Sequence, residues 1–361
     1  MPSEGFVGRM GLGRFLRHGA RADAAMPIGA PPANVAPPGP MMAAYRRDGS
    51  ALARLEPEEP LRAAVWVDLY RPDEALSARV KAELGVEVPT LEDMEEIEVS
   101  NRLYREEGLE VMTAILPGAL PNGAQDSGPV TFLLGPERLV TVRHHAPRPF
   151  ETYPQRADRS STGCGSTDRL FLGLIEEIVA RLADHVEASD RALDALAARI
   201  YAGTEQSLTQ AELEQALKAT GRQGEVLARV RLGLLTLERM LSVFGLWSDA
   251  RGEGKALRPH LKSTMRDLQA LEEHADFLSG RVGLATDTTL GMVNLSQNQT
   301  VRILSVVATL FLPPTLIGTI YGMNFHFMPE LDEVWGYPIA LVAMLISALA
   351  SWAYFKWRGW L

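Results

Sequence analysis

The string Tyr321-Gly322-Met323-Asn324-Phe325 ends one long apolar run and stands just before a second. Residues 303–325 and residues 334–355 contain no Asp, Glu, Lys or Arg. Each run is long enough to cross a bilayer, because a membrane-spanning helix needs about 20 residues. We therefore expect a C-terminal membrane hairpin, made of a first transmembrane helix over 301–325, an external loop over 326–333, a second transmembrane helix over 334–355 and a tail over 356–361.

The same string carries a family resemblance. Together with Met328-Pro329-Glu330-Leu331 and Trp335-Gly336-Tyr337-Pro338, it resembles the CorA family of magnesium and cobalt channels. Members of that family have a Gly-Met-Asn signature at the outer end of the first membrane helix, and their second helix ends in basic and aromatic residues, as residues 356–361 do here. The resemblance is close over residues 287–361 and weaker, in the same order, from about residue 65. His326 departs from it, because the family commonly has an acidic residue there.

The composition of the chain mainly reflects the part outside the membrane. With 46% hydrophobic and 22% charged residues, the 361-residue chain has the composition of an ordinary soluble protein of two or three domains. The formal net charge of −9 argues against a nucleic-acid surface and suits a protein that binds cations. The single Cys164 excludes an internal disulfide and a cysteine metal cluster, and we expect it to be an inert surface thiol.

Residues 1–42 have too few large apolar side chains to build a core. They combine an arginine-rich start with a proline-rich segment over 31–40, so we expect a disordered N-terminal extension. Two alternatives remain open. An arginine-rich, acid-poor start is also typical of a transit peptide, and the start could have been assigned too early, with Met41 or Met42 near the true beginning.

The remaining chain predicts an α+β membrane protein with a cytoplasmic α/β domain over 43–156, a helical stalk over 157–300 and the membrane hairpin. Short β-rich runs predict strands over 64–69, 109–116, 130–134 and 138–142, with helices over 72–84 and 91–97. Residues 155–168, rich in Ser, Thr, Gly and charge, predict a linker or a tight surface loop. Apolar residues at helical spacing predict stalk helices over 169–200, 209–247 and 259–320, the last of which continues into the membrane.

One face of that last helix is small and polar, whereas the positions between are bulky and apolar. The stripe consists of Asp287, Gly291, Asn294, Asn298, Val301, Ser305, Ala308, Leu312, Thr315, Thr319 and Gly322. Small residues permit close helix packing in lipid, so the stripe alone fits packing and pore equally well. The asparagines at its inner end, and Asn324 beyond its outer end, favour a pore.

Because one helix cannot enclose a pore, the stripe predicts a ring of subunits, and the resemblance implies a funnel-shaped homopentamer. It also implies that Gly322, Met323 and Asn324 form the selectivity filter. A ring of neutral amide oxygens can hydrogen-bond the tightly held waters of Mg²⁺ without stripping them. In this reading Leu312 and Val301 form hydrophobic constrictions, and Asn298 and Asp287 form hydrophilic positions toward the cytosol.

The distribution of charge predicts the orientation. Arg302, Lys356 and Arg358 flank the two membrane helices on one side, whereas the loop carries the acids Glu330, Asp332 and Glu333. By the positive-inside rule both termini are cytoplasmic, in the plasma membrane, which for a bacterium is the inner membrane. The acidic loop then concentrates divalent cations, and an inward-negative potential drives entry by about 2.3 kcal/mol per charge per 100 mV.

The expected partners are the lipid bilayer, further copies of the chain and the ions Mg²⁺ and Co²⁺, with no nucleic acid and no nucleotide, since a Walker A sequence is absent. We expect no enzyme and no cofactor other than Mg²⁺ as transported and regulatory ion. Ser160-Ser161 and Cys164 have no base at a recognisable spacing, and His144-His145 lack a third metal ligand, which predicts a surface or loop role for them.

The resemblance further implies regulation by divalent ions held between the α/β domain of one subunit and the stalk of its neighbour. Asp93 matches the α/β side, and Asp267 lies near the position expected on the stalk. Acidic side chains on helices are usually only solvated, so these two assignments depend on the resemblance alone.

Two other readings remain. The first is a zinc transporter of the same architecture, of the ZntB type. The Met-Pro-Glu-Leu loop favours the magnesium branch, whereas His326 favours softer ions such as Zn²⁺, Co²⁺ or Ni²⁺. The second is a non-conducting, membrane-anchored coiled-coil signalling or scaffold protein, which would leave the polar stripe without an explanation.

Overall fold

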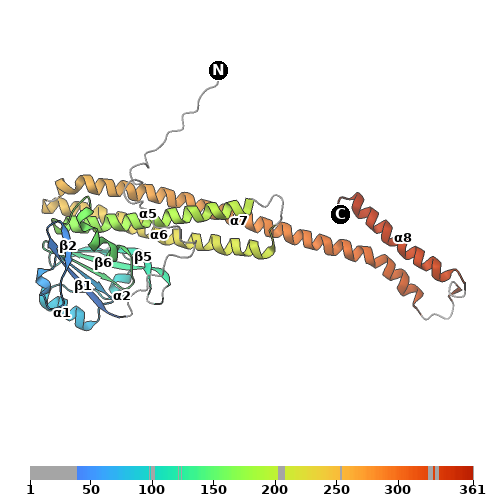
Figure 1. Cartoon of the computed structure of the whole chain (residues 1–361), viewed down its shortest axis with the longest axis horizontal. Helices are drawn as coiled ribbons and strands as arrows, with labels where there is room; N and C mark the ends of the chain where they lie inside the picture. The colour runs from blue at the N-terminus through green and yellow to red at the C-terminus, as the bar shows by residue number, and fades with distance from the viewer. Residues whose placement is uncertain are drawn as a thin grey trace, which may run out of the picture.

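The computed structural model describes residues 39–96, 98, 102–120, 122, 124–201, 208–252, 254–323, 328–329 and 333–360. The predicted N-terminal extension therefore lies almost entirely outside the described residues. The described chain has an α/β domain, three long helices beside it, and a helical hairpin at the far end (Figure 1).

The α/β domain is built on a mixed sheet of seven strands in the order β2-β1-β3-β7-β6-β5-β4. Only β3 and β7 pair in parallel, and the other neighbours are antiparallel. The strands are β1 (Met41–Asp48), β2 (Ala51–Arg54), β3 (Trp66–Tyr70), β4 (Leu103–Glu106), β5 (Leu109–Ala119), β6 (Gln125–Leu134) and β7 (Leu139–Arg143). Strand β1 starts at Met41, so Met41 and Met42 belong to the sheet rather than to the extension in which we placed them.

Both faces of the central strands are buried, and alternate side chains serve different cores. In β6, Phe132 contributes to the core under the long helices, whereas Leu133 faces the small helices α1 (Glu74–Leu84) and α2 (Leu91–Glu95). Helix α1 is held at its start by Asp73, whose side chain accepts a hydrogen bond from the Leu76 amide. Burial on both faces explains why these strands read as continuous apolar runs.

Three long helices follow the sheet: α5 (Thr167–Tyr201), α6 (Gln210–Arg251) and α7 (Gly254–Tyr321). Helices α5 and α6 cover the sheet face opposite α1, and α7 packs against both of them (Figure 1). At 1.5 Å per residue the 68 residues of α7 extend for about 100 Å. Helix α7 therefore joins the α/β end of the molecule to the membrane hairpin without interruption, although Pro313 and Pro314 lie inside it.

Residues 155–168, predicted as a linker or a tight surface loop, form a compact loop that reaches into the core. Between β7 and α5 the chain forms three short helices, α4 (Pro149–Thr152), η3 (Tyr153–Gln155) and η4 (Ala157–Arg159); a further short helix, η2 (Leu61–Ala63), precedes β3. Tyr153 and Cys164 are fully buried among the core residues. The prediction of a surface thiol was therefore wrong, because Cys164 packs beneath the β1–β2 turn with its Sγ 3.2 Å from the Ser50 carbonyl oxygen.

The two histidines lie in the bend after β7, as the loop alternative of the prediction has it, but His145 is not at the surface. Its side chain is buried, with Nε2 2.8 Å from the Leu116 carbonyl oxygen. Gly118 and Gly128 make room for the ring, since a Cβ at either position would lie less than 3 Å from it. Burial lowers the pKa of His145 to about 4, so the ring is neutral in the folded domain.

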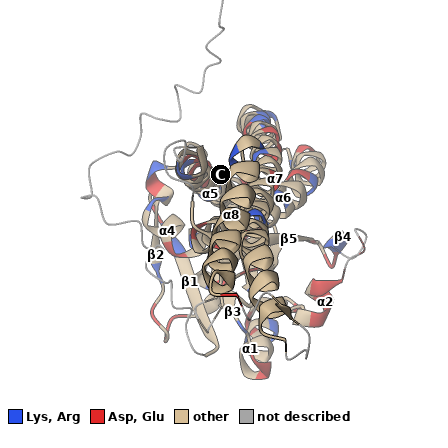
Figure 2. Ribbon diagram, turned by 90° about the vertical axis from the view of Figure 1, so that its right-hand side faces the viewer, with Lys and Arg blue, Asp and Glu red and all other residues tan. Residues whose placement is uncertain are grey.

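The hairpin consists of the last part of α7 and helix α8 (Gly336–Trp357), which runs back beside it. Both helices are long and apolar enough to cross a membrane. In Figure 2 the ribbon of α8, at the front, is tan over most of its length, whereas the ribbons of the soluble part carry many blue and red segments. The two helices contact each other closely, because a Cβ at Gly318 would lie 3.2 Å from Cε of Met344.

Candidate ion pathway

The polar stripe of α7 is fully exposed in the single chain. Every member is exposed to solvent: Asp287, Gly291, Asn294, Asn298, Val301, Ser305, Ala308, Leu312, Thr315, Thr319 and Gly322. At 3.6 residues per turn, buried Val306 and close-packed Gly318 lie to either side of the face opposite the stripe. Helix α8 therefore covers the back of α7 and leaves the stripe free.

The two threonines of the stripe present their hydroxyl oxygens as acceptors rather than donors. Thr315 donates its hydroxyl hydrogen to the Phe311 carbonyl, and Thr319 donates to the Thr315 carbonyl, each at 2.7 Å. Since these hydrogens are used within the helix, the lone pairs of the hydroxyl oxygens remain available on the exposed side. Such acceptors suit the outward-pointing hydrogens of water molecules bound to a cation.

Two stripe members are large and apolar. Leu312 is 64% exposed and Val301 is 62% exposed, so in the single chain neither has the cover that a large apolar side chain normally finds. Lipid or other copies of the chain must supply that cover. If copies of α7 surround an axis, these two side chains mark its driest positions.

The outer end of the stripe coincides with the end of helix α7. The amide of Gly322 donates to the Gly318 carbonyl oxygen at 3.0 Å, and the amide of Met323 donates to Ile320 at 3.2 Å. Gly322 has little room for a side chain, because a Cβ there would lie 3.2 Å from the Gly318 carbonyl oxygen. Asn324, His326, Glu330 and Asp332 lie outside the described residues, and of the predicted loop acids only Glu333, which is exposed, is described.

Asp93 lies at the start of α2, where it forms a capping box with Thr90. Its Oδ2 accepts hydrogen bonds from the Thr90 amide (2.9 Å) and the Thr90 hydroxyl (2.7 Å). These bonds lower the pKa of Asp93, so the carboxylate is ionised at neutral pH. No described residue donates a hydrogen bond to Oδ1, the second oxygen of the same group.

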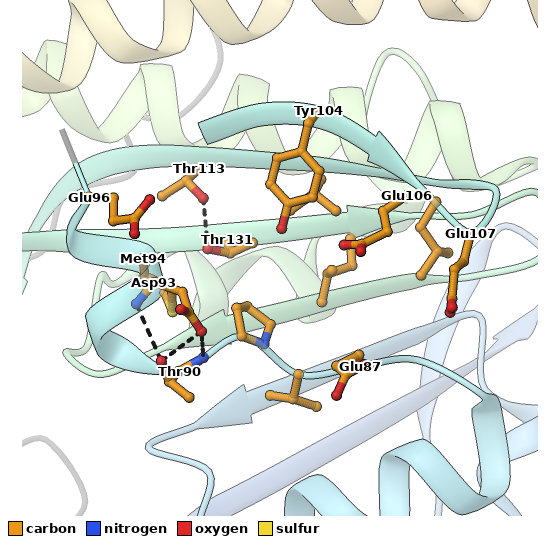
Figure 3. A pocket seen from close by; sticks show the side chains of 15 residues that line it. Glu87, Thr90, Asp93, Met94, Glu96, Tyr104, Glu106, Glu107, Thr113 and Thr131 are labelled. Atoms are coloured by element: carbon orange, nitrogen blue, oxygen red, sulfur yellow. Dashed lines mark hydrogen bonds between the residues drawn. The ribbon is translucent and has the colours of Figure 1, made fainter. Parts of the chain in front are cut away.

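The carboxylate of Asp93 also borders a cavity of about 500 Å³ between α2 and the β4–β5 edge of the sheet. Figure 3 shows the acidic side chains around this cavity: Glu87, Asp93, Glu96, Glu106 and Glu107. This concentration of negative charge could be offset by a bound cation.

Asp267 lies in a different place, half-buried on the side of α7 that faces α5. It lines a cavity of about 400 Å³ with Ser161, Glu176, His260 and Ser263. Burial raises the pKa of Asp267, and burial together with the neighbouring Asp267 raises the pKa of Glu176. In one chain Asp93 and Asp267 do not meet. Among the described residues, no group of three or more His, Cys, Asp or Glu side chains is arranged to hold a metal ion.

Sequence reasoning missed a buried ionic cluster that joins the two halves of the soluble part. Arg251, at the end of α6, pairs with Asp168 of α5 at 2.8 Å and with Glu110 of β5. Glu110 also pairs with Arg105 at 2.7 Å. Both acids have side chains less than 5% exposed, so the cluster is internal and fixes the position of the helices on the sheet. The sequence gives one sign of this cluster: Glu110 is an acid within the apolar run that forms β5.

Comparison with known proteins relates this architecture to one family. The sequence model of the "CorA-like Mg2+ transporter protein" family matches residues 62–357. The magnesium transport protein CorA of Escherichia coli K12 is 35% identical over 324 residues, which cover 89% of this chain and all of the relative. The magnesium transport protein CorA of Salmonella typhimurium is also 35% identical over the same shares of both chains.

Solved structures show the same fold. The complete CorA magnesium transporter of Methanocaldococcus jannaschii superimposes with a TM-score of 0.61 at 17% identity, covering 89% of this chain and 99% of that one. Full-length CmaX superimposes with a TM-score of 0.59 at 14% identity, covering 88% and 97%. The family match spans both the soluble part and the membrane hairpin, and the chain belongs to the CorA-like Mg²⁺ transporter family.

Proposed function

We propose that this divalent cation transporter is a passive channel for Mg²⁺ and Co²⁺ that is driven by the membrane potential. The observation that carries the proposal is the exposed polar stripe on the face of α7 opposite α8. The curated relatives are named as magnesium transport proteins, which favours Mg²⁺ as the principal ion. A Mg²⁺ ion carries two charges, so 100 mV supplies about 4.6 kcal/mol for its entry.

The proposed channel is a homopentamer in the bacterial inner membrane, with both termini in the cytoplasm. The α/β domain and the end of α8 lie toward the same side of the hairpin (Figure 1). The basic residues Arg302, Lys356 and Arg358 are at that side, and Glu333 is at the other. This arrangement is the one that the positive-inside rule assigns to a cytoplasmic α/β domain.

The proposed selectivity filter is a ring of Asn324 side chains together with Gly322 and Met323. Below it, Leu312 and Val301 form the dry gate, and Asn298 and Asp287 provide hydrated positions toward the cytosol. The threonine oxygens at positions 315 and 319, which are open as acceptors, support passage of an ion that keeps its water shell.

The proposed regulation uses Mg²⁺ bound between neighbouring subunits. Asp93 of one subunit and Asp267 of the next would repel each other unless a divalent ion bridges them. Bound Mg²⁺ then favours the closed ring, and falling cytosolic Mg²⁺ releases it. The separation of the two acids in one chain, and the negative cavity beside Asp93, support a site completed by a second subunit.

The decisive experiment measures ion flux into vesicles that contain the full-length chain. Uptake of Mg²⁺, Co²⁺ and Zn²⁺ is compared with and without an imposed potential, and with and without a pH gradient. We expect Mg²⁺ and Co²⁺ entry that follows the potential and needs no pH gradient. Zn²⁺ entry that depends on the pH gradient would instead favour the zinc-transporting alternative, which His326 keeps open.

The matched variant for this experiment is Asn324→Ala. It should abolish Mg²⁺ uptake and leave the oligomer intact on a sizing column, because the side chain acts only at the mouth of the pore. Normal Mg²⁺ uptake by this variant would exclude Asn324 as the selectivity ring. An intact oligomer that passes none of the three ions would favour the scaffold alternative.

A further inference from the structure

Helix α8 ends in a turn that folds the chain back onto α7. Gly359 has a φ of 69°, a left-handed conformation that favours glycine. The amide of Trp360 donates to the Phe355 carbonyl oxygen at 3.0 Å, and the amide of Gly359 donates to Lys356 at 3.2 Å, as in a Schellman motif. The turn places the Trp360 ring 5.7 Å from the Phe355 ring and 6.0 Å from Cζ of Arg302 on α7. We call this arrangement of Phe355, Trp360 and Arg302 the C-terminal clasp.

Three cations lie at the clasp, and each has an aromatic ring on one side. Arg302 faces Trp360, Nζ of Lys356 lies 4.8 Å from the Trp352 ring, and Cζ of Arg358 lies 5.9 Å from the Tyr354 ring. All three cationic side chains are exposed. Within the part of the chain that the structure describes, none of them forms an ion pair, and residues 288–329 and 334–361 contain no Asp or Glu. Positive charge therefore gathers here without a protein counter-charge.

The position of this cluster along the hairpin identifies what meets it. Arg302 immediately precedes the uncharged run of α7, and Lys356 immediately follows that of α8. The cluster therefore lies at headgroup depth, on the membrane side nearer the α/β domain. Trp357 is 81% exposed and Trp360 is 48% exposed, as expected for indole rings at the boundary between headgroups and acyl chains.

We propose that Arg302, Lys356 and Arg358 bind the phosphates of anionic phospholipids around this end of the hairpin, with the exposed indole rings against their acyl chains. Lys356 and Arg358 are two positions apart on α8 and stack on different rings, so they meet different lipids. Guanidinium groups offer paired donors to phosphate oxygens, and the aromatic rings restrict the cations on their other side. A free phosphate ion would satisfy the cations but leave the apolar rings uncovered. Because Arg302 comes from α7 and the other two cations from α8, bound lipids hold both helices at this depth, next in sequence to Val301, where we place one constriction.

The proposal depends on membrane insertion of the hairpin and not on which ion is carried. The test uses the full-length protein, purified in detergent and exchanged into mixed micelles containing phosphatidylglycerol or phosphatidylcholine. Retained lipid is measured by native mass spectrometry, so no flux is needed. We expect wild type to retain phosphatidylglycerol at least about tenfold more strongly than phosphatidylcholine.

Variants distinguish a lipid site with a defined geometry from nonspecific attraction between basic side chains and anionic lipid. Arg358→Gln and Lys356→Gln should each weaken retention of phosphatidylglycerol by about fivefold, and Arg358→Lys should weaken it less. Gly359→Ala keeps all three charges but opposes the φ of 69°, so it should also lower the preference by loosening the clasp. Arg266→Gln, an exposed cation of α7 outside the hairpin, is the control and should bind lipid like wild type.

Three results would overturn the proposal. Equal retention of the two lipids by wild type would show that no anionic headgroup is selected. Unchanged retention in both charge variants, with the oligomer intact on a sizing column, would place the lipid elsewhere. Release of phosphatidylglycerol by millimolar inorganic phosphate would show that the cluster binds free phosphate rather than lipid.

Discussion

At the scale of single residues, the two oxygens of Asp93 have different environments. Both hydrogen bonds from Thr90 go to Oδ2, whereas Oδ1 accepts none from a described residue, and Asp93 borders the acidic cavity. The residue can therefore cap α2 and still contribute a charge to a site formed with a neighbouring subunit. Because both roles involve one carboxylate, a simple deletion of Asp93 would confuse them.

A pair of substitutions separates the two roles. Asp93→Asn keeps an oxygen acceptor for the cap and removes the charge, so the shift in Tm on adding millimolar Mg²⁺ should shrink. Thr90→Ala removes part of the cap and keeps the charge, so it should cost about 1 kcal/mol and keep the Mg²⁺ shift. Thermal unfolding of the full-length protein measures both effects. Equal Mg²⁺ shifts in wild type and Asp93→Asn would remove Asp93 from the regulatory site.

His145 makes the stability of the α/β domain depend on pH. Its pKa is about 4 in the folded state against about 6.5 in an unfolded chain. The unfolded state therefore binds the proton more readily, and stability is full above pH 6.5 and falls as the pH drops toward 4. The expected loss is about 3 kcal/mol for this group.

Thermal unfolding between pH 7 and pH 4.5 tests this dependence. His145→Gln should give a shallower pH slope than wild type, although not a flat one, because burial also lowers the pKa of His185 to about 4. His274→Gln, on the surface of α7, is the control and should keep the wild-type slope. A slope that stays unchanged in His145→Gln would contradict the assignment.

At the scale of elements, Arg251 connects β5, α5 and α6 through Glu110 and Asp168. Arg251→Ala should cost about 3 to 5 kcal/mol, because it leaves the buried carboxylate of Asp168 without its cation and Glu110 with Arg105 alone. Arg258→Ala breaks an exposed pair with Asp249 at the same corner and should cost at most about 1 kcal/mol. Denaturant unfolding measures both. Similar costs for the two variants would mean that the cluster does not hold the helices on the sheet.

The elements predicted from sequence were those with long or continuous apolar patterns. Such patterns mark the membrane part of α7, helix α8 and the strands β3, β5, β6 and β7. Strands β1, β2 and β4 were missed because they lie toward the sheet edges and carry charged or small residues, as Arg46 and Arg47 in β1 show. For residues 155–168 the tight-loop alternative was the better one, because Ala157 and Cys164 are core residues and a free linker would leave them exposed.

The polar stripe could be read from sequence because helical spacing fixes which residues share a face. The ionic contacts could not, because each depends on residues far apart in the chain. Arg251 meets Asp168 across 83 positions, and Arg143 meets Asp68 across 75. The residues near an arginine in the sequence do not indicate with which distant acid it will pair.

The predicted gate lies on a single element, the membrane part of α7. Leu312→Asn should wet the constriction and raise Mg²⁺ leak into vesicles at high Mg²⁺ on the cytoplasmic side. Val307→Asn, an exposed position of α7 outside the stripe, is the control and should leave the leak unchanged. If Leu312→Asn leaks no more than wild type, the stripe has been assigned to the wrong face of the helix.

At the scale of the whole molecule, the stripe has a function only if several copies of α7 surround water. The chain offers a clean way to test this, because its single Cys164 is buried and burial raises the pKa of its thiol. Background reaction with a water-soluble thiol reagent should therefore be slow. Introduced cysteines can then report which face of α7 meets water.

Ser305→Cys places a thiol within the stripe, and Ile303→Cys places one on an exposed face turned away from it. A cationic methanethiosulfonate reagent should react with the first in the assembled protein and block Mg²⁺ flux, because it adds a positive group inside the pore. The second thiol should face lipid, react slowly and leave the flux unchanged. Equal labelling at both positions would mean that the stripe does not line a common aqueous path, whatever number of subunits assembles. If the reagent blocks flux in Ser305→Cys alone, the stripe lines the water-filled path of the ion. Because one chain cannot enclose that water, the same result would also show that several copies of α7 surround it.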